Sequence, residues 1–239
     1  LNFKISDRSL FTIIGEILEL KNDFGCSTIG ASKKVQIEFV SANPTGPLHV
    51  GHGRGAALGS ALSSIYTACG FEVVKEYYVN DAGRQMDILA ASVYLRMKEE
   101  TGRESTYPSL CYQGDYVRRL AVDYLKSSTL NIRMEEFGFD EVELKGETDS
   151  DLDNLIGEIK AVLGLENFAQ LKAYAASVIT GSIREDLENF RVDFEEWYSE
   201  QKMHDFGLID SVLSSLETKG HTYSRDKATW FRPAALGDE

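Results

Sequence analysis

The sequence predicts an α/β fold in which a parallel sheet is interrupted by a mostly helical insertion. Strand patterns at residues 35–40 and 72–79 are rich in β-branched and aromatic residues, and helical patterns follow them at 51–69 and 83–100. Strand, helix, strand and helix in close succession are typical of a parallel sheet. Residues 101–185 have mostly helical patterns and no convincing strand. A Rossmann-like core with an inserted helical segment is therefore expected.

The first three predicted helices each carry an apolar stripe and a recognisable end. Ser6 or Asp7 can cap the first helix, and Gly70 follows the second as a typical C-terminal residue. The stripes are Leu10, Ile13, Ile14, Ile17 and Leu18 in the first helix, Leu58, Leu62, Ile65 and Cys69 in the second, and Met86, Leu89, Ala90, Val93 and Met97 in the third.

Strand character returns after the insertion. The last helical pattern of the insertion has the apolar residues Phe168, Leu171, Ala175, Val178, Ile183, Leu187 and Phe190. Residues 192–198 then predict a strand, and residues 209–216 predict a helix that ends before Gly220. Two short strands, at 222–223 and 229–232, are expected around a turn.

The composition is that of an ordinary globular protein, with 43% hydrophobic and 26% charged residues. No apolar run approaches the ~20 residues that span a bilayer, and no signal-peptide pattern opens the chain. Cys26, Cys69 and Cys111 fit neither a disulfide framework nor a zinc pattern. We therefore expect a cytoplasmic protein with reduced thiols, no membrane contact and no tightly bound metal.

The net charge of −13 is concentrated in the second part of the chain. Residues 1–100 are nearly neutral, whereas residues 101–239 hold 27 acidic against 15 basic residues. The run at 135–158 has ten acidic residues and one lysine, and we interpret it as a solvated surface without a site. This balance counts against a stand-alone nucleic-acid binder, which needs a basic surface to neutralise phosphates.

Chemistry is predicted at residues 41–54, where the first strand leads into the second helix. Open α/β sheets bind ligands at such junctions, and a helix N-terminus attracts anions. His49 and His52 are three residues apart, so both can donate hydrogen bonds to phosphate oxygens during a transfer reaction. Gly51 and Gly53 leave room for a base or phosphate to approach the backbone.

The histidines have two other interpretations. A metal half-site would need a further cysteine or carboxylate at ligand spacing, and the sequence has none there. Incidental surface histidines are disfavoured because this one junction holds two of the four histidines of the chain.

The string Pro-Thr-Gly-Pro-Leu-His-Val-Gly-His at 44–52 resembles the HIGH motif of class I aminoacyl-tRNA synthetases. Longer strings at 35–55 and 77–85 are similar specifically to arginyl-tRNA synthetases, and the second reads Tyr-Tyr-Val-Asn-Asp-Ala-Gly-Arg-Gln. The resemblance covers essentially the whole chain. Looser matches lie at 114–116, 183–187 and 230–232.

The resemblance implies a domain division. Residues 1–30 would be the tail of an N-terminal tRNA-contacting domain with a linking helix, and 31–100 the first half of a Rossmann-type catalytic domain. Residues 101–185 would be the helical insertion, and 186–239 a truncated return to the catalytic core. Both ends of the chain are then expected to lie inside a longer protein.

The resemblance also implies the activity of an arginine–tRNA ligase. L-arginine would attack the α-phosphate of ATP, bound with Mg²⁺, and the arginyl group would pass to the terminal adenosine of tRNA(Arg). His49 and His52 would be catalytic, in a protein expected to be a monomer. The ATP-binding residues would be Ser41, Pro47, His49, Gly51, His52 and Gly53.

Recognition of arginine requires acceptors for a guanidinium and an ammonium group. Glu38 and Asn43 match family positions that hold the amino acid, although Glu38 could instead face solvent and Asn43 could be a turn residue. Asn80, Asp81 and Gln85 are expected in the pocket or near the tRNA end, and Asn80-Asp81 is alternatively a turn and helix-start pair.

The sequence departs from the family at Gly46, where some members have a lysine. A second, lysine-rich signature and an anticodon-binding domain are also absent from these 239 residues. The chain is therefore expected to be catalytically incomplete by itself. The alternatives are another class I synthetase or nucleotidylyl transferase, and a non-catalytic tRNA- or protein-binding module.

Overall fold

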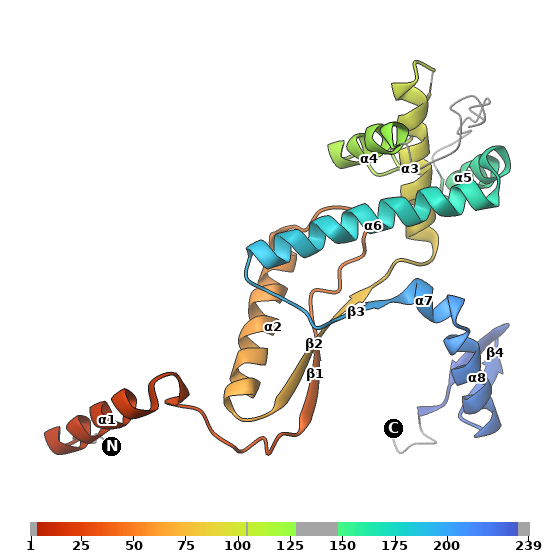
Figure 1. Cartoon of the computed structure of the whole chain (residues 1–239). Coiled ribbons are helices and arrows are strands. Elements are labelled where there is room, and N and C mark those ends of the chain that lie inside the picture. The colour runs from red at the N-terminus through yellow and green to blue at the C-terminus, as the bar shows by residue number, and fades with distance from the viewer. Residues whose placement is uncertain (1–3, 104, 128–147, 234–239) are drawn as a thin grey trace. The chain divides into compact units, whose positions relative to one another are not determined.

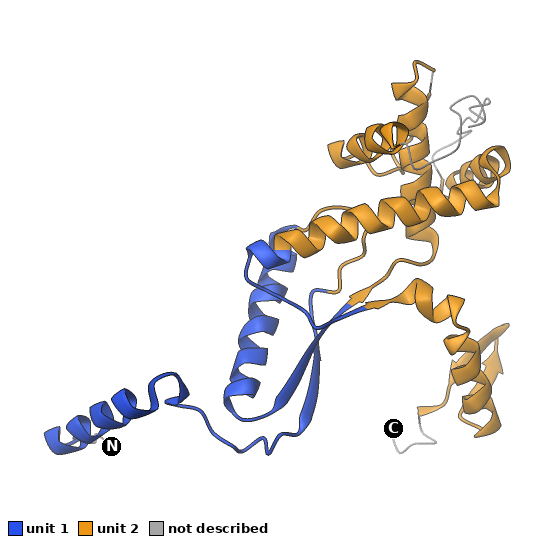
Figure 2. Cartoon of the chain, viewed as in Figure 1, with its two compact units in different colours: residues 1–40, 49–77, 187–197 blue, residues 41–48, 78–186, 198–239 orange. Residues whose placement is uncertain are grey.

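The computed structural model describes residues 4–103, 105–127 and 148–233. The chain forms two compact units, shown in Figure 2. The first unit comprises residues 1–40, 49–77 and 187–197, and the second comprises residues 41–48, 78–186 and 198–239.

The predicted α/β fold is confirmed by a three-stranded sheet in the order β1-β2-β3, with helices between its strands (Figure 1). In the described part of residues 101–185 every regular element is a helix, as predicted. The elements are α1 (Asp7–Leu20), the 3₁₀-helix η1 (Lys21–Asp23), β1 (Lys34–Glu38), α2 (Val50–Ala68), β2 (Glu72–Val79), α3 (Arg84–Glu100), α4 (Asp115–Lys126), α5 (Asp149–Leu163), α6 (Leu165–Asn189), β3 (Glu196–Ser199), α7 (Glu200–Asp205), α8 (Leu208–Thr218), β4 (Thr222–Arg225) and β5 (Ala228–Phe231).

In the first unit, β1 and β2 pair in parallel, with Glu38 opposite Glu76. An aromatic cluster supports them: the Phe194 ring lies 4.5 Å from that of Phe39 and 5.4 Å from that of Tyr77. Lys75 donates from Nζ to Asp193 at 2.7 Å, which holds the segment before β3 beside β2. Regular strand geometry starts only at Glu196, so the strand predicted at 192–198 begins later than expected.

The predicted buried stripe of α2 is wrong. Leu58, Leu62 and Ile65 are 70%, 41% and 60% exposed, and the buried residues of α2 are Ala56, Gly59 and Ser63. A Cβ atom on Gly59 would lie 2.2 Å from Cγ of Phe39. The helix therefore packs through small side chains that let its backbone approach the aromatic cluster, and periodicity of large residues does not detect such a face.

The predicted first helix is confirmed as α1, and its Ser6 cap accepts a hydrogen bond from the backbone N–H of Ser9. None of its residues is buried within the described part of the chain. The apolar face formed by Leu10, Ile13, Ile14, Ile17 and Leu18 is therefore exposed here.

In the second unit, α3 is the central helix and packs against α4 and α5. Its predicted stripe is buried, and so are its remaining sides, including Ala91, Ser92 and Tyr94. The stripe of α6 is also largely confirmed, except that Val178 and Phe190 are 43% and 54% exposed.

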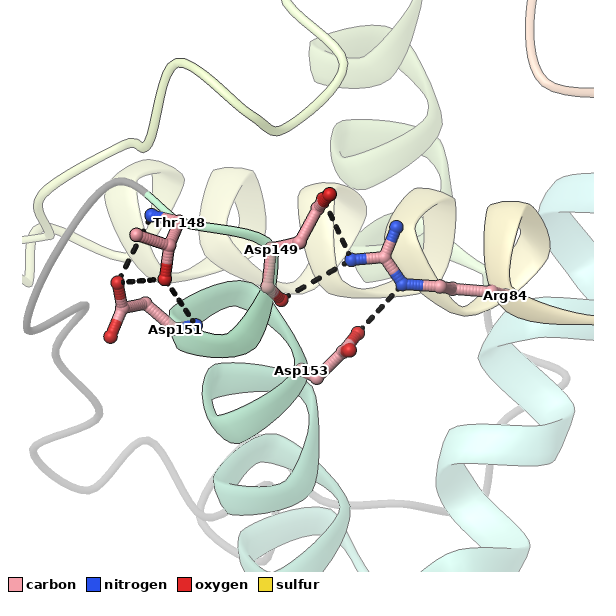
Figure 3. A network of polar contacts seen from close by, with 5 residues as sticks. All are labelled: Arg84, Thr148, Asp149, Asp151 and Asp153. Atoms are coloured by element: carbon pink, nitrogen blue, oxygen red, sulfur yellow. Dashed lines mark hydrogen bonds and ion pairs between the residues drawn. The ribbon is translucent and has the colours of Figure 1, made fainter.

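The solvated surface predicted at 135–158 is confirmed for the acidic side chains that the structure describes, since those of 149–158 are exposed or half-buried. Residues 135–147 lie outside the described residues, but residues 149–158 belong to α5, whose side chains Leu152, Leu155 and Ile156 are buried. Figure 3 shows Arg84 of α3 reaching the start of α5, where it donates to Asp149 at 3.0 Å and to Asp153 at 2.7 Å. Charge patterning alone did not reveal the apolar face of α5 or the pairing with Arg84.

The hairpin predicted near the end of the chain is confirmed as β4 and β5, which pair antiparallel. Asp226 and Lys227 at its turn both have positive φ angles, 53° and 62°, as a type I′ turn requires. Among the helices that the structure describes, none has both the length and the apolar character needed to span a bilayer.

Candidate active site

The chain leaves β1 through a strained turn. Val40 and Ser41 have φ angles of 65° and 42°, a region that residues with a Cβ atom rarely adopt. Ser41 stabilises the turn because its Oγ accepts a hydrogen bond from the backbone N–H of Tyr78 at 3.0 Å. Backbone strain of this kind is concentrated at functional sites, which supports a functional role for the segment that follows.

Asn43 and Gln85, predicted separately as site residues, are hydrogen-bonded to each other. Nδ2 of Asn43 donates to Oε1 of Gln85 at 2.5 Å, although 42 residues separate them. Gln85 stands in the first turn of α3, whose N-cap residue Gly83 has a φ of 79° that suits a residue without a Cβ atom. Asn43 is therefore more than a turn residue, because its amide has a defined partner.

Tyr116 of α4 contacts the turn at residues 41–48, which the sequence did not reveal. Its hydroxyl donates to the carbonyl oxygen of Thr45 at 2.7 Å, and a Cβ atom on Gly46 would lie 3.0 Å from that hydroxyl. Gly46 thus leaves room for the phenol. Burial raises the pKa of Tyr116 to about 12, so the hydroxyl keeps its proton and remains a donor.

The two histidines stand at the start of α2, as the sequence predicted. His49 is the N-cap residue, with extended backbone angles, and its Nδ1 accepts from the backbone N–H of Gly51 at 3.1 Å. Nδ1 of His52 accepts from the backbone N–H of His49 at 3.2 Å. The two hydrogen bonds form a capping box made of two imidazoles. The rings stack with their centroids 3.8 Å apart.

Gly51 makes room for one of these rings. A Cβ atom at this position would lie 3.0 Å from Cε1 and 3.1 Å from Nδ1 of His49, whereas a Cβ atom on Gly53 would meet nothing within 4 Å. Burial lowers the pKa of His52 below its ordinary value of 6.5, and the charge of His49 lowers it further. The stacked pair therefore favours a neutral His52.

Glu38 lies on the exposed face of β1 and belongs to a row of carboxylates in the first unit. Glu76 is its partner in the parallel register and accepts from Nε2 of Gln36 at 2.6 Å. Burial raises the pKa of Glu76, and the negative charges of Glu38 and Glu196 raise it further. This negative row suits a cationic ligand, and sequence reasoning found only its first member.

Asp81 is engaged at the start of α7. Its Oδ2 accepts from the Ser199 hydroxyl at 2.7 Å, and its Oδ1 accepts from the backbone N–H of Gln201 at 2.8 Å. Ser199 in turn caps α7, because its Oγ accepts from the backbone N–H of Lys202. The carboxylate is thus bound by the last residue of β3 and the start of α7. Its predicted contact with a ligand stays a prediction.

The remaining predicted residues are Pro47 and Asn80. Pro47 is exposed, and Asn80 is half-buried directly after the end of β2. Glu38, His49, Gly51, His52 and Gly53 belong to the first unit; Ser41, Asn43, Pro47, Asn80, Asp81 and Gln85 belong to the second. Residues 4–103, 105–127 and 148–233 contain no group of three metal-ligating side chains. A Mg²⁺ ion that arrives with ATP needs no such group, because phosphates and water can ligate it.

Comparison with known proteins now decides the family. The family model described as "tRNA synthetases class I (R), catalytic domain" matches residues 14–147, more than half of the chain. The chain belongs to this class I arginyl-tRNA synthetase family. The resemblance predicted from residues 35–55 and 77–85 is therefore confirmed.

Two curated relatives named arginine–tRNA ligase, from Hydrogenovibrio crunogenus and Acidithiobacillus ferrooxidans, are each 43% identical over the whole chain. The chain covers 42% and 41% of their lengths, so it spans about two fifths of these synthetases. A solved arginyl-tRNA synthetase structure from Campylobacter jejuni superimposes on 98% of the chain with a TM-score of 0.72 and 28% identity. The chain covers 45% of that structure, and the TM-score supports the same fold for the superimposed part.

Proposed function

We propose that the chain supplies the histidine-bearing half of an arginine–tRNA ligase active site. In the complete protein, arginine and ATP would give arginyl-adenylate and pyrophosphate, and the arginyl group would then pass to the 3′-terminal adenosine of tRNA(Arg). The observation that carries the proposal is the histidine pair at the N-terminus of α2 in a chain of this family. The chain alone spans about two fifths of its relatives and is expected to be inactive alone.

The proposed role of His49 and His52 is electrostatic. When the arginine carboxylate attacks the α-phosphate, negative charge develops on the phosphate oxygens, and the histidines donate hydrogen bonds to them. The dipole at the N-terminus of α2 adds to this stabilisation. Ser41, Pro47, Gly51 and Gly53 are proposed as the further ATP contacts, and Mg²⁺ as the ion that accompanies ATP.

The proposed arginine contacts are Glu38 and Asn43. A carboxylate in the negative row of β1 and β2 can pair with a guanidinium or ammonium group. The bond from Asn43 to Gln85 uses its Nδ2, and the amide oxygen is the acceptor that an ammonium group needs. Asn80, Asp81 and Gln85 stay proposed as residues of the pocket or of the tRNA-end contact. The division at residues 30, 100 and 185, the monomeric state and the cytoplasmic location also stay predictions.

ATP–pyrophosphate exchange by the full-length protein tests the activity. With tRNA(Arg) present, arginine should support exchange and each other amino acid should not. Exchange with a different amino acid would replace the assignment by that of another class I synthetase. Binding of tRNA without exchange for any amino acid would instead favour a non-catalytic module.

Substitution of His52 by alanine tests the residue assignment. Loss of one transition-state donor should lower the rate of adenylate formation by ~10²-fold or more. The matched control is His204→Ala, an exposed histidine of α7, which should leave the rate unchanged. Equal rates for His52→Ala and the unsubstituted enzyme would remove His52 from the mechanism.

A further inference from the structure

The cap of α2 constrains the protonation of both histidines. A backbone N–H group points at Nδ1 of each ring, from Gly51 to His49 at 3.1 Å and from His49 to His52 at 3.2 Å. A ring nitrogen that accepts a hydrogen bond uses its lone pair and cannot carry a proton. Each Nδ1 is therefore unprotonated, and the single proton of each neutral ring must be on Nε2.

We propose that His49 and His52 act as the N-terminal cap of α2, and that this cap fixes both rings as neutral Nε2–H tautomers whose Nε2–H groups are the donors of the site. The backbone thereby selects the tautomer, a task that a carboxylate or carbonyl partner performs for many catalytic histidines. The proposal deepens the proposed function: the cap and the tautomers are properties of the free protein, and only the use of the donors rests on adenylate formation.

Three further observations support the cap. His49 has the extended backbone angles of an N-cap residue, φ −123° and ψ 173°, so its side chain can fold back over the first turn. Gly51 leaves space for that ring, since a Cβ atom there would lie 3.1 Å from Nδ1 of His49. The rings also stack at 3.8 Å, an arrangement that favours at most one positive charge on the pair.

Substitution by two amide side chains of different length separates the capping role of His49 from its role as a donor. In His49→Asn, the side-chain oxygen takes the place of Nδ1 and can accept from Gly51, but no donor replaces Nε2–H. In His49→Gln, the longer amide can place an N–H near the position of Nε2, but it lacks an acceptor beside the backbone. The first variant keeps the cap and the second keeps the donor.

Thermal unfolding of the 239-residue chain and adenylate formation by the full-length protein then give opposite rankings. His49→Asn should unfold within about 1 °C of the unsubstituted protein and lose ~10²-fold in rate. His49→Gln should unfold ~3 °C lower because a cap is lost, and should be roughly tenfold faster than His49→Asn. Equal melting temperatures of the two variants would overturn the capping role of His49. Equal rates of adenylate formation by the two variants would overturn the role of its Nε2–H group as a donor.

Nuclear magnetic resonance of the free protein tests the tautomers without any activity. In a two-bond ¹H–¹⁵N correlation spectrum of ¹⁵N-histidine protein above pH 8, both rings should show the pattern of the Nε2–H tautomer. The signals are assigned by their loss in His49→Asn and His52→Asn. An Nδ1–H pattern, or an averaged mixture, for either ring would overturn the proposal. If arginine failed to support exchange while both patterns were found, only the proposed function would fall.

Discussion

Helices α2 and α3 each follow a strand of the sheet, yet they are built in opposite ways. Within the described residues, α2 buries only Ala56, Gly59 and Ser63 and exposes its leucines. Helix α3 is buried on nearly every side and packs against α4 and α5. Helix α2, which carries the proposed catalytic histidines, thus packs through small residues against an aromatic cluster. Helix α3 packs through large apolar residues. Hydrophobic periodicity detects the second kind of packing and misplaces the first.

The largest expected effect compares one leucine from each helix. Leu89→Ala in α3 should reduce the free energy of unfolding by about 2–5 kcal/mol, because Leu89 is fully buried and the substitution leaves a cavity. Leu58→Ala in α2 should change it by less than about 0.5 kcal/mol, because Leu58 is 70% exposed. Urea denaturation of the 239-residue chain measures both values. A similar cost at both positions would remove the contrast between the helices.

A second pair tests the close packing of α2 itself. Gly59→Ala should destabilise the chain by about 1–3 kcal/mol, because its Cβ atom would overlap the Phe39 ring. Gly55→Ala is the control: its Cβ atom meets nothing within 4 Å, and alanine favours a helix by about 0.5–1 kcal/mol. The same denaturation experiment should therefore give changes of opposite sign. Stabilisation by both substitutions would show that α2 does not approach Phe39 closely.

Tyr116→Phe probes how the second unit holds the turn at residues 41–48. Loss of the hydrogen bond to Thr45 should reduce the free energy of unfolding by about 1 kcal/mol. The pKa of Tyr116 is raised to about 12 in the folded chain, so its contribution is present below pH 10 and is lost between pH 10 and about 12. Denaturation midpoints of both proteins across this range provide the measurement, and curves of identical pH dependence would contradict the raised pKa of Tyr116.

The smallest expected effect is the pH dependence of the histidine cap. Because the pKa of His52 is lowered by folding, the unfolded chain takes up a proton first as the pH falls below 6.5. Stability should therefore fall below pH 6.5 and level off once the pH is below the lowered value. His52→Gln keeps an acceptor at this capping-box position without titrating, so its stability should fall less over the same range. A steeper fall in the variant would contradict the lowered pKa.

The sequence was most informative where one local pattern decides the outcome. The histidines at the start of α2, the stripe of α3 and the turn of the β4–β5 hairpin were all predicted from residues close together in the chain. It did not reveal the partner of the acidic run, where Asp149 and Asp153 pair with Arg84 across more than 60 residues. Charge patterning alone gives no information about a distant partner of opposite sign.

By itself, the sequence determined the alternation of strands and helices, the position of the histidine turn and the arginyl-tRNA synthetase family, because these depend on local spacing and motifs. Tertiary structure alone decided which face of α2 is buried and which partners Asn43, Tyr116 and Asp81 take, at separations of 42, 71 and 118 residues. The physical reason is that a hydrogen bond or a packed ring depends on distances in space. Only folding brings such distant residues within reach.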